Sequence, residues 1–179
     1  RTVSIALTFI IPVRHQDNAK DWSRLKANLT QTLASISNQT ADCWRAIVVA
    51  NEGADLPPLP KNVEALRVTF PPNRLHEKGN ATQEEFYEAF RIDKGRRVLA
   101  AMVAAEPTSH FMIVDDDDLV SGRLADFVAR NRAAYGWVVK QGYVWTDQGS
   151  YLFAYPDLNG LCGSTLIIRS DLYELPTAA

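Results

Sequence analysis

The chain has 179 residues, of which 46% are hydrophobic and 22% are charged, and its formal net charge is −2. These totals predict one globular domain with a sizeable core. They exclude the basic charge pattern of a nucleic-acid-binding protein, and no stretch of sequence is long and apolar enough for a transmembrane helix. The two cysteines, Cys43 and Cys162, lack metal-ligand spacing, so we expect two reduced thiols.

The first half of the chain alternates apolar runs with helical spacing. Residues 5–13 form an apolar run that is typical of a buried parallel strand. Apolar residues three and four positions apart then predict a helix over 22–36. Residues 44–50 and 63–70 predict two further strands, and the proline-rich stretch 56–60 between them predicts a loop.

The second half begins with helical patterns and ends in short strands. A capping-box pattern at residues 82–85 predicts a short helix over 84–90. A separate helix is predicted over 98–103, and Ser121 is a candidate N-cap for a third helix that ends at Gly136. Further strands are predicted over residues 110–114, 137–145, 150–155 and 164–169.

The strongest chemical signal is a run of four aspartates, Asp115 to Asp118, directly after the apolar run 110–114. The alternation of strands and helices over 1–120 predicts an α/β fold with a mostly parallel sheet, in which ligands bind at the carboxyl ends of strands. Adjacent carboxylates repel each other by about 1 kcal/mol in water and about 4 kcal/mol at the effective dielectric constant of a protein. Oxygen ligands suit Mg²⁺ or Mn²⁺, which commonly bridge to phosphates. The run therefore predicts a metal-dependent enzyme that acts on a phosphorylated or nucleotide-linked substrate.

Six segments, taken in order, resemble the glycosyltransferases of the GT-A fold, and among those the large family 2 type. They are residues 9–14, 25–39, 47–52, 93–97, 114–118 and 159–164. The resemblance implies a Rossmann-like three-layer α/β/α sandwich with a mostly parallel central sheet and a smaller mixed-strand C-terminal part. It also implies a single domain over 1–179, with a nucleotide-sugar-binding half over 1–120 and the start of an acceptor-side half over 121–179.

The same resemblance implies an activity. A hexose would pass from a nucleotide-sugar donor, usually a UDP-sugar, to a hydroxyl group of a saccharide or a lipid-linked acceptor. Mn²⁺ or Mg²⁺ would join the donor diphosphate to the DxD aspartates. No export signal is visible, so we expect a cytoplasmic location, at the inner membrane face if the acceptor is lipid-linked.

The family pattern Asp-x-Asp-Asp falls on Asp115, Asp117 and Asp118, which the resemblance therefore implies as metal ligands. Asp115 and Asp117 share one face of an extended chain. Asp115 and Asp116 are also candidate donor contacts. The alternative is that some of these four carboxylates cap the following turn or helix.

Donor-binding positions of the family also match the ends of the first two predicted strands. The loop of Pro12, Val13 and Arg14 matches the family loop that holds the base and ribose, and Glu52 matches the acidic position that meets the uridine. The alternatives are that Arg14 is a surface arginine and that Glu52 is a solvated turn residue.

A third donor-binding segment of the family matches Asp93, Lys94 and Arg97. We expect these residues to open the helix that precedes the aspartates. A helix N-terminus with adjacent cations suits a diphosphate. Alternatively, Lys94 and Arg97 belong to the exposed face of that helix.

The acceptor side is less defined. Five aromatic residues either pack in the core or form a wall on which a sugar stacks: Trp137, Tyr143, Trp145, Tyr151 and Phe153. An inverting enzyme also needs a carboxylate base. The family places it beyond the strand that matches 164–169, so we expect the base beyond Ala179, with Asp147 and Asp157 as weak candidates. Inversion or retention stays open.

Three other classes compete with the glycosyltransferase. A sugar-phosphate nucleotidyltransferase typically has a glycine-rich loop after the first strand, and residues 12–17 contain no glycine. A haloacid-dehalogenase-type phosphatase has its Asp-x-Asp motif after the first strand, whereas three predicted strands precede the motif here. The third class is a non-catalytic module that binds a nucleotide sugar or a cation.

Overall fold

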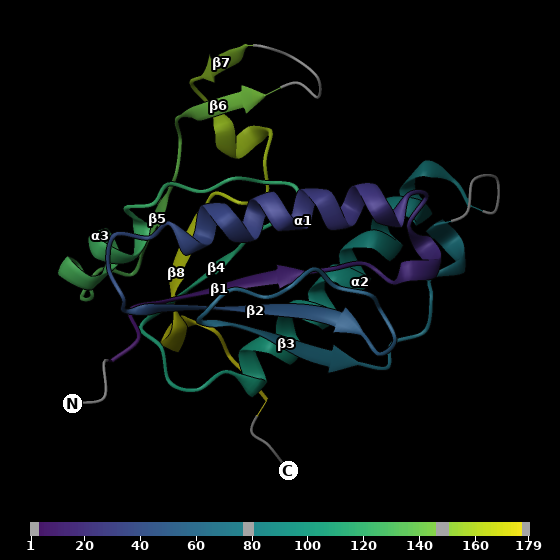
Figure 1. The fold of residues 1–179 in the computed structure, drawn as a ribbon, viewed down its shortest axis with the longest axis horizontal. Coiled ribbons are helices and arrows are strands. Elements are labelled where there is room, and N and C mark those ends of the chain that lie inside the picture. Colours follow the sequence, from purple (N-terminus) through teal and green to yellow (C-terminus); the bar gives the residue numbers. More distant parts are fainter. Residues whose placement is uncertain (1–3, 77–80, 146–150, 177–179) are drawn as a thin grey trace.

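The computed structural model describes residues 4–76, 81–145 and 151–176 (Figure 1). A six-stranded sheet has the order β3-β2-β1-β4-β8-β5, and a separate two-stranded sheet pairs β6 with β7. The strands of the large sheet are β1 (Leu7–Pro12), β2 (Trp44–Asn51), β3 (Val63–Val68), β4 (His110–Ile113), β5 (Gly136–Val138) and β8 (Leu166–Arg169). The small sheet contains β6 (Gly142–Trp145) and β7 (Leu152–Tyr155).

Four neighbouring strands of the large sheet, β3, β2, β1 and β4, are parallel, and β8 and β5 run antiparallel at one side. In the parallel part Ile10 of β1 lies opposite Ile47 of β2 and Ile113 of β4. Residues 7–11 of β1 are all buried, as expected for a central parallel strand that is covered on both faces. The carboxyl ends of β1 and β4 consequently lie at the same edge of the sheet.

Helices cover both faces of the sheet, so the predicted three-layer α/β/α fold is confirmed. Helix α1 (Trp22–Ser37) and helix α3 (Leu124–Arg130) pack on one face, and helix α2 (Gln83–Ala104) packs on the other (Figure 1). Alternate residues of β1 divide between the two cores, with Phe9 in the α1 core and Ile10 in the α2 core. Short 3₁₀ helices complete the fold: η1 (Gln16–Asn18), η2 (Arg74–His76), η3 (Leu158–Gly160) and η4 (Ser170–Leu172).

Helix α2 corrects the prediction of two separate helices. The capping box is confirmed, because the Thr82 side chain accepts from the backbone N–H of Glu85 while the Glu85 carboxylate accepts from the backbone N–H of Thr82. The helix then continues through Gly95, so residues 93–97 lie in its interior and do not form its N-terminus. An interior glycine costs about 1 kcal/mol relative to alanine. Burial of Ala101 and Met102 against the sheet offsets that cost.

The segment after the aspartates also differs from the prediction. Helix α3 ends at Arg130, and Ser121 is not its N-cap, which is Arg123. Gly136 opens β5, where a Cβ atom would lie 2.4 Å from the carbonyl oxygen of Ile167, so the close pairing with β8 requires glycine. The single strand predicted over 137–145 is two strands in different sheets, and the hairpin of β6 and β7 stands apart from the large sheet (Figure 1).

Two further findings concern the described part of the chain. Cys43 and Cys162 are free thiols, as predicted, although both are half-buried rather than fully buried. Within residues 4–76, 81–145 and 151–176, no helix has the length and apolar character needed to cross a bilayer.

Candidate functional site

A pocket of about 220 Å³ opens where the carboxyl ends of β1 and β4 meet helix α2. Nine residues line it: Pro12, Arg14, Phe90, Asp93, Lys94, Arg97, Asp115, Asp116 and Asp117. The structure thus brings together all the predicted donor-binding residues except Val13 and Glu52, and adds Asp117. Phe90 was missed, and its apolar side chain on a helix carries no sequence signal that separates it from a core residue.

Two predicted donor residues lie elsewhere. The Val13 side chain is fully buried in the core beneath α1, so only its backbone is left for the predicted donor contact. Glu52 is exposed in the turn just after β2, outside the pocket lining, and its backbone N–H donates to the carbonyl oxygen of Val68. Of the two weak candidates for a base, Asp157 is exposed beside η3, and Asp147 lies outside the described residues.

Asp115 forms an ion pair with Lys94, with 2.5 Å between Oδ1 and Nζ. Their side chains are 31% and 25% exposed respectively, so the pair is partly withdrawn from water. Lys94 lies in the middle of α2, and it reaches the strand end from the side of the helix rather than from its N-terminus. Lys94 was predicted as a donor-binding cation at a helix N-terminus; the structure places it inside α2, beside the aspartates.

Asp116 and Asp117 carry uncompensated negative charge. Burial, and then the charge of Asp117, raises the pKa of Asp116 to about 6. Burial also raises the pKa of Asp117, followed by the charges of Asp118 and Asp115. The positive charge of Arg14, which also lines the pocket, lowers both pKa values and so partly offsets these increases. The Oδ2 atom of Asp116 is buried and has no hydrogen-bond partner within the described part of the chain.

Asp118 is held by the segment that leads into β8. Its Oδ2 atom accepts hydrogen bonds from the Ser164 hydroxyl (2.6 Å) and from the Cys162 thiol (3.0 Å). The Ser164 hydroxyl also accepts from the backbone N–H of Asp115 (2.8 Å). Gly163 lies between Cys162 and Ser164 in the sequence. A Cβ atom at this position would lie 3.2 Å from Asp115 Oδ2 and 3.3 Å from Lys94 Nζ.

These contacts give residues 162–164 a place in the site that sequence reasoning did not assign. The segment belongs to the motif 159–164 that carried the resemblance, so a signal existed, but nothing in it indicated which atoms would meet the aspartates. Asp118 remains a predicted metal ligand, and one of its two oxygens is already engaged.

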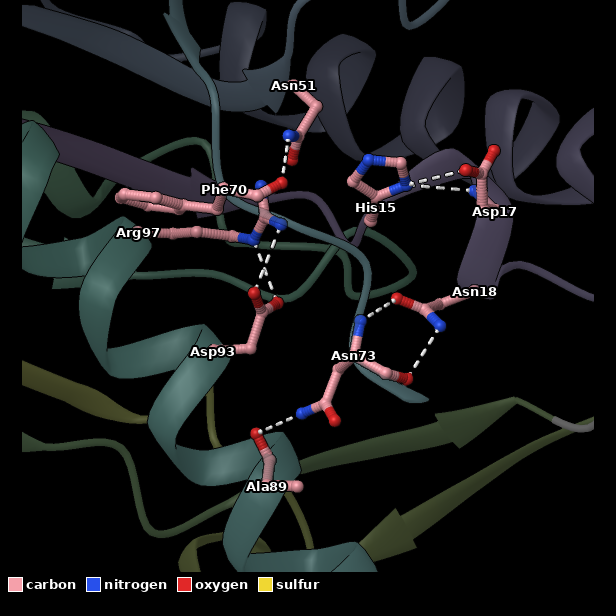
Figure 2. Close-up of polar contacts among 9 residues, drawn as sticks. All are labelled: His15, Asp17, Asn18, Asn51, Phe70, Asn73, Ala89, Asp93 and Arg97. Carbon is pink, nitrogen blue, oxygen red and sulfur yellow. Dashed lines mark hydrogen bonds and ion pairs between the residues drawn. The ribbon is translucent and has the colours of Figure 1, made fainter. Parts of the chain in front are cut away.

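Arg97 forms the deep wall of the pocket, with only 1% of its surface exposed (Figure 2). Its guanidinium group donates two hydrogen bonds to Asp93, from Nε (2.8 Å) and Nη2 (3.1 Å), and lies over the ring of Phe70 at 5.6 Å. Its third nitrogen, Nη1, is buried without a partner in the described residues. Arg97 is therefore not on an exposed helix face, and it keeps one unused donor.

The loop after β3 is tied to η1 on one side and to helix α2 on the other. Asn73 and Asn18 exchange two hydrogen bonds of 2.8 and 2.9 Å, and the Asn73 amide also donates to the carbonyl oxygen of Ala89 in α2 (Figure 2). His15 is buried beside this loop, and its Nδ1 atom accepts from the backbone N–H of Asp17 (3.1 Å). These contacts connect the loop after β1 to α2 and hold the residues around Arg14 in place.

The donor set of the site fits Mg²⁺ or Mn²⁺ together with a diphosphate. In the described part of the chain, no group of three or more His, Cys, Asp or Glu side chains is arranged to hold a metal ion by itself. Mg²⁺ is usually held by one or two carboxylates plus substrate phosphates and water, so a complete protein cage is not required. The orphaned oxygen of Asp116 and the raised pKa of Asp117 indicate negative charge that a cation would neutralise.

The predicted aromatic residues separate into two groups. Trp137 packs against the core beneath α1 and contacts the rings of His110 and Phe127. The others lie on or beside the β6–β7 hairpin, and all are more than half exposed: Tyr143, Trp145, Tyr151 and Phe153. Core packing is therefore wrong for these four. The pairing of β6 with β7 places Tyr143 and Trp145 on one face of the two-stranded sheet and Phe153 on the other.

Comparisons with known proteins bear on the fold. No family model matches the sequence, and no curated protein matches it. The chain is similar in structure to residues 1–349 of S. aureus TarS, with a TM-score of 0.51 and 16% sequence identity, over 93% of this chain and 47% of that one. It therefore spans about half the length of that solved chain.

The fold is of the Rossmann-like GT-A or nucleotidyltransferase type. A second solved structure, 4-diphosphocytidyl-2C-methyl-D-erythritol synthase from Anaerococcus prevotii, aligns with a TM-score of 0.47 and 11% identity, over 98% of this chain and 79% of its own. At 16% identity the likeness to TarS establishes the fold alone. What binds in the pocket has to be argued from the pocket itself.

Proposed function

We propose that the chain is the donor-binding part of a metal-dependent glycosyltransferase that transfers a hexose from a UDP-sugar to an acceptor hydroxyl. The observation that carries this proposal is the pocket, where three cationic side chains meet three successive aspartates at the carboxyl edge of a parallel sheet. Nucleotide ligands bind at this edge in open α/β folds. The structural likeness to TarS, a glycosyltransferase, supports the same class.

In this proposal the cations and aspartates divide the donor between them. Arg14 and Lys94 face the diphosphate, and Arg97 offers its unused Nη1 donor to an oxygen of the nucleotide. Asp115 and Asp117 would hold Mn²⁺ or Mg²⁺, with Asp118 as the third predicted ligand. The bound cation would neutralise the charge that develops on the leaving diphosphate.

The remaining chemistry is an attack by an acceptor hydroxyl on the anomeric carbon, which requires a base near that hydroxyl. The exposed rings of Tyr143 and Trp145, which share one face of the β6–β7 sheet, are the candidate surface for a saccharide acceptor. If so, Trp145→Ala raises the KM for the acceptor and leaves the affinity for UDP unchanged.

Calorimetric titration of UDP, with GDP and CMP as controls, tests the donor site. We expect UDP to bind in the presence of Mn²⁺ and to bind much more weakly without it. Asp117→Asn is expected to abolish the contribution of the metal, whereas Asp126→Asn, which removes a carboxylate from the exposed side of α3, leaves it intact. Absence of nucleotide binding under every condition would exclude the proposal for this chain.

A sugar-phosphate nucleotidyltransferase remains compatible with the fold. The two enzymes differ in the bond that they break, because a nucleotidyltransferase releases pyrophosphate and a glycosyltransferase releases a nucleoside diphosphate. An assay that separates these two products decides between them. A protein that binds UDP with Mn²⁺ and yields neither product, even as the full-length chain, is a binding module.

A further inference from the structure

The ion pair between Lys94 and Asp115 occupies a carboxylate that the proposed function assigns to a divalent cation. Nζ lies 2.5 Å from Oδ1 of Asp115, and Gly163 packs against both partners. Lys94 therefore sits in a confined position, and its charge cannot move far without a new partner. A carboxylate that contacts an ammonium group is a poor ligand for a second cation, because the two positive charges repel each other.

The charges around the pocket show how the empty site is balanced. Its lining includes four carboxylates, on Asp93, Asp115, Asp116 and Asp117, and the cations of Arg14, Lys94 and Arg97. Asp93 and Arg97 neutralise each other through two hydrogen bonds. Lys94 and Arg14 then remain for Asp115, Asp116 and Asp117, and the charge of the adjacent Asp118 acts on Asp117 as well. By pairing with Asp115, Lys94 cancels part of the negative charge that would otherwise attract a divalent ion.

A diphosphate changes this balance. It brings two or more negative charges beside Lys94, so the ammonium group gains a new partner at the same time as the cation gains phosphate ligands. Lys94 lies in the interior of α2, which fixes its Cα atom, but its side chain has four rotatable bonds. The exchange therefore needs only a side-chain movement.

We propose that Lys94 is a resident counter-ion that makes binding of the divalent cation at Asp115 conditional on the nucleoside diphosphate. In the free protein Lys94 neutralises Asp115. In the complex Lys94 pairs with the diphosphate and releases Asp115 to the cation. This inference rests on the proposed function, and it implies that Mn²⁺ alone binds weakly and that Mn²⁺ and UDP bind cooperatively.

The test is Lys94→Met, which keeps an unbranched apolar stem and removes the charge. Mn²⁺ alone, followed by electron paramagnetic resonance of the free ion, is expected to bind about tenfold more tightly, since a neighbouring charge shifts the affinity of a carboxylate by that factor or more. UDP in saturating Mn²⁺, followed by calorimetry, is expected to bind about tenfold more weakly, because the phosphate loses its lysine. These opposite signs distinguish the exchange from a merely structural ion pair.

Two variants serve as controls. Arg91→Met removes a charge from the same helix at an exposed residue paired with Glu88, and neither affinity should change by more than about twofold. Lys94→Arg retains the positive charge, so its affinity for Mn²⁺ alone should stay near that of the wild type.

Each outcome decides a separate question. If Lys94→Met leaves the affinity for Mn²⁺ unchanged or weakens it while the wild type binds UDP, the exchange is overturned and the proposed function stands. If the wild type binds no UDP, the proposed function and the exchange that rests on it are both overturned. If Lys94→Met does not fold, tighter Mn²⁺ binding by Lys94→Gln supports the exchange, and unchanged binding overturns it.

Discussion

The Ser164 hydroxyl lies 2.6 Å from the Oδ2 atom of Asp118, although 46 residues separate them in the sequence. The same hydroxyl accepts from the backbone N–H of Asp115, so one side chain joins the first and last residues of the aspartate run. Ser164 is 7% exposed, and these bonds are therefore shielded from water. The shape of the aspartate turn depends on a segment that follows it by more than forty residues.

Ser164→Ala should destabilise the fold and weaken UDP binding in Mn²⁺. The substitution leaves the N–H of Asp115 without its partner, and an unsatisfied buried group costs about 1–3 kcal/mol. Urea unfolding measures this change. Ser37→Ala is the control, because its hydroxyl donates to the Leu33 carbonyl within α1 and removing it leaves the N–H of Asp115 paired. A Ser164→Ala protein that loses stability but binds UDP normally would show that the contact does not shape the site.

Substitution of two glycines by alanine should affect two different properties, UDP binding at Gly163 and stability at Gly95. A methyl group on Gly163 would press on Asp115 and Lys94, so we expect Gly163→Ala to weaken UDP binding by about fivefold, or roughly 1 kcal/mol. Gly95 is in the exposed interior of α2, with no described atom within 4 Å of a Cβ position. Gly95→Ala should therefore stabilise the protein by about 1 kcal/mol. Calorimetry measures UDP binding and thermal unfolding measures stability, each for both variants. Weaker UDP binding by Gly95→Ala together with unchanged binding by Gly163→Ala would contradict the prediction.

Asp116 should make stability depend on pH. Its pKa is raised to about 6 in the folded protein from an ordinary value of 3.8, so the unfolded chain releases this proton at lower pH than the folded one. The contribution of Asp116 to the free energy of unfolding therefore falls as pH rises from about 4 to about 6, by at most about 3 kcal/mol. Asp116→Asn should be more stable than the wild type above pH 6 and equally stable at pH 4.

Urea unfolding at four pH values between 4 and 7, in EDTA, measures the effect of Asp116. Asp55→Asn is a matched control, since it changes an exposed carboxylate paired with Lys26 outside the pocket. A gain in Asp116→Asn that is the same at pH 4 and pH 7 would mean that ionisation of Asp116 is not its cause.

Cys162 should be alkylated slowly. Burial, and then its hydrogen bond to the Asp118 carboxylate, raises the pKa of this thiol to about 11. At pH 8 the reactive thiolate is then about one part in a thousand, against roughly a quarter for an ordinary cysteine. Asp118→Asn should accelerate the reaction of Cys162 with iodoacetamide, and mass spectrometry can follow this site separately from Cys43. An equal rate in both proteins would exclude the carboxylate as the cause.

The local sequence pattern predicted the strands that are buried along nearly their whole length. The strands β1, β2 and β4 were predicted within two residues of their bounds, because a continuous apolar run of this length suits a strand covered on both faces. The break predicted after residue 90 was wrong, because helix formation is cooperative and burial of the following turns carries α2 through it. The division of 137–145 into β5 and β6 was missed, because alternation does not indicate which sheet a strand joins.

The sequence by itself determined the fold class and placed most of the candidate donor residues in one set, because parallel strands end at a common edge and the residues that follow them must lie close together. Only the tertiary structure decided that Lys94 pairs with Asp115, that residues 162–164 hold the aspartate turn, and that Val13 and Glu52 lie outside the pocket. These contacts join residues that are far apart in the chain, so they depend on the order of strands and the packing of α2, which no local pattern records.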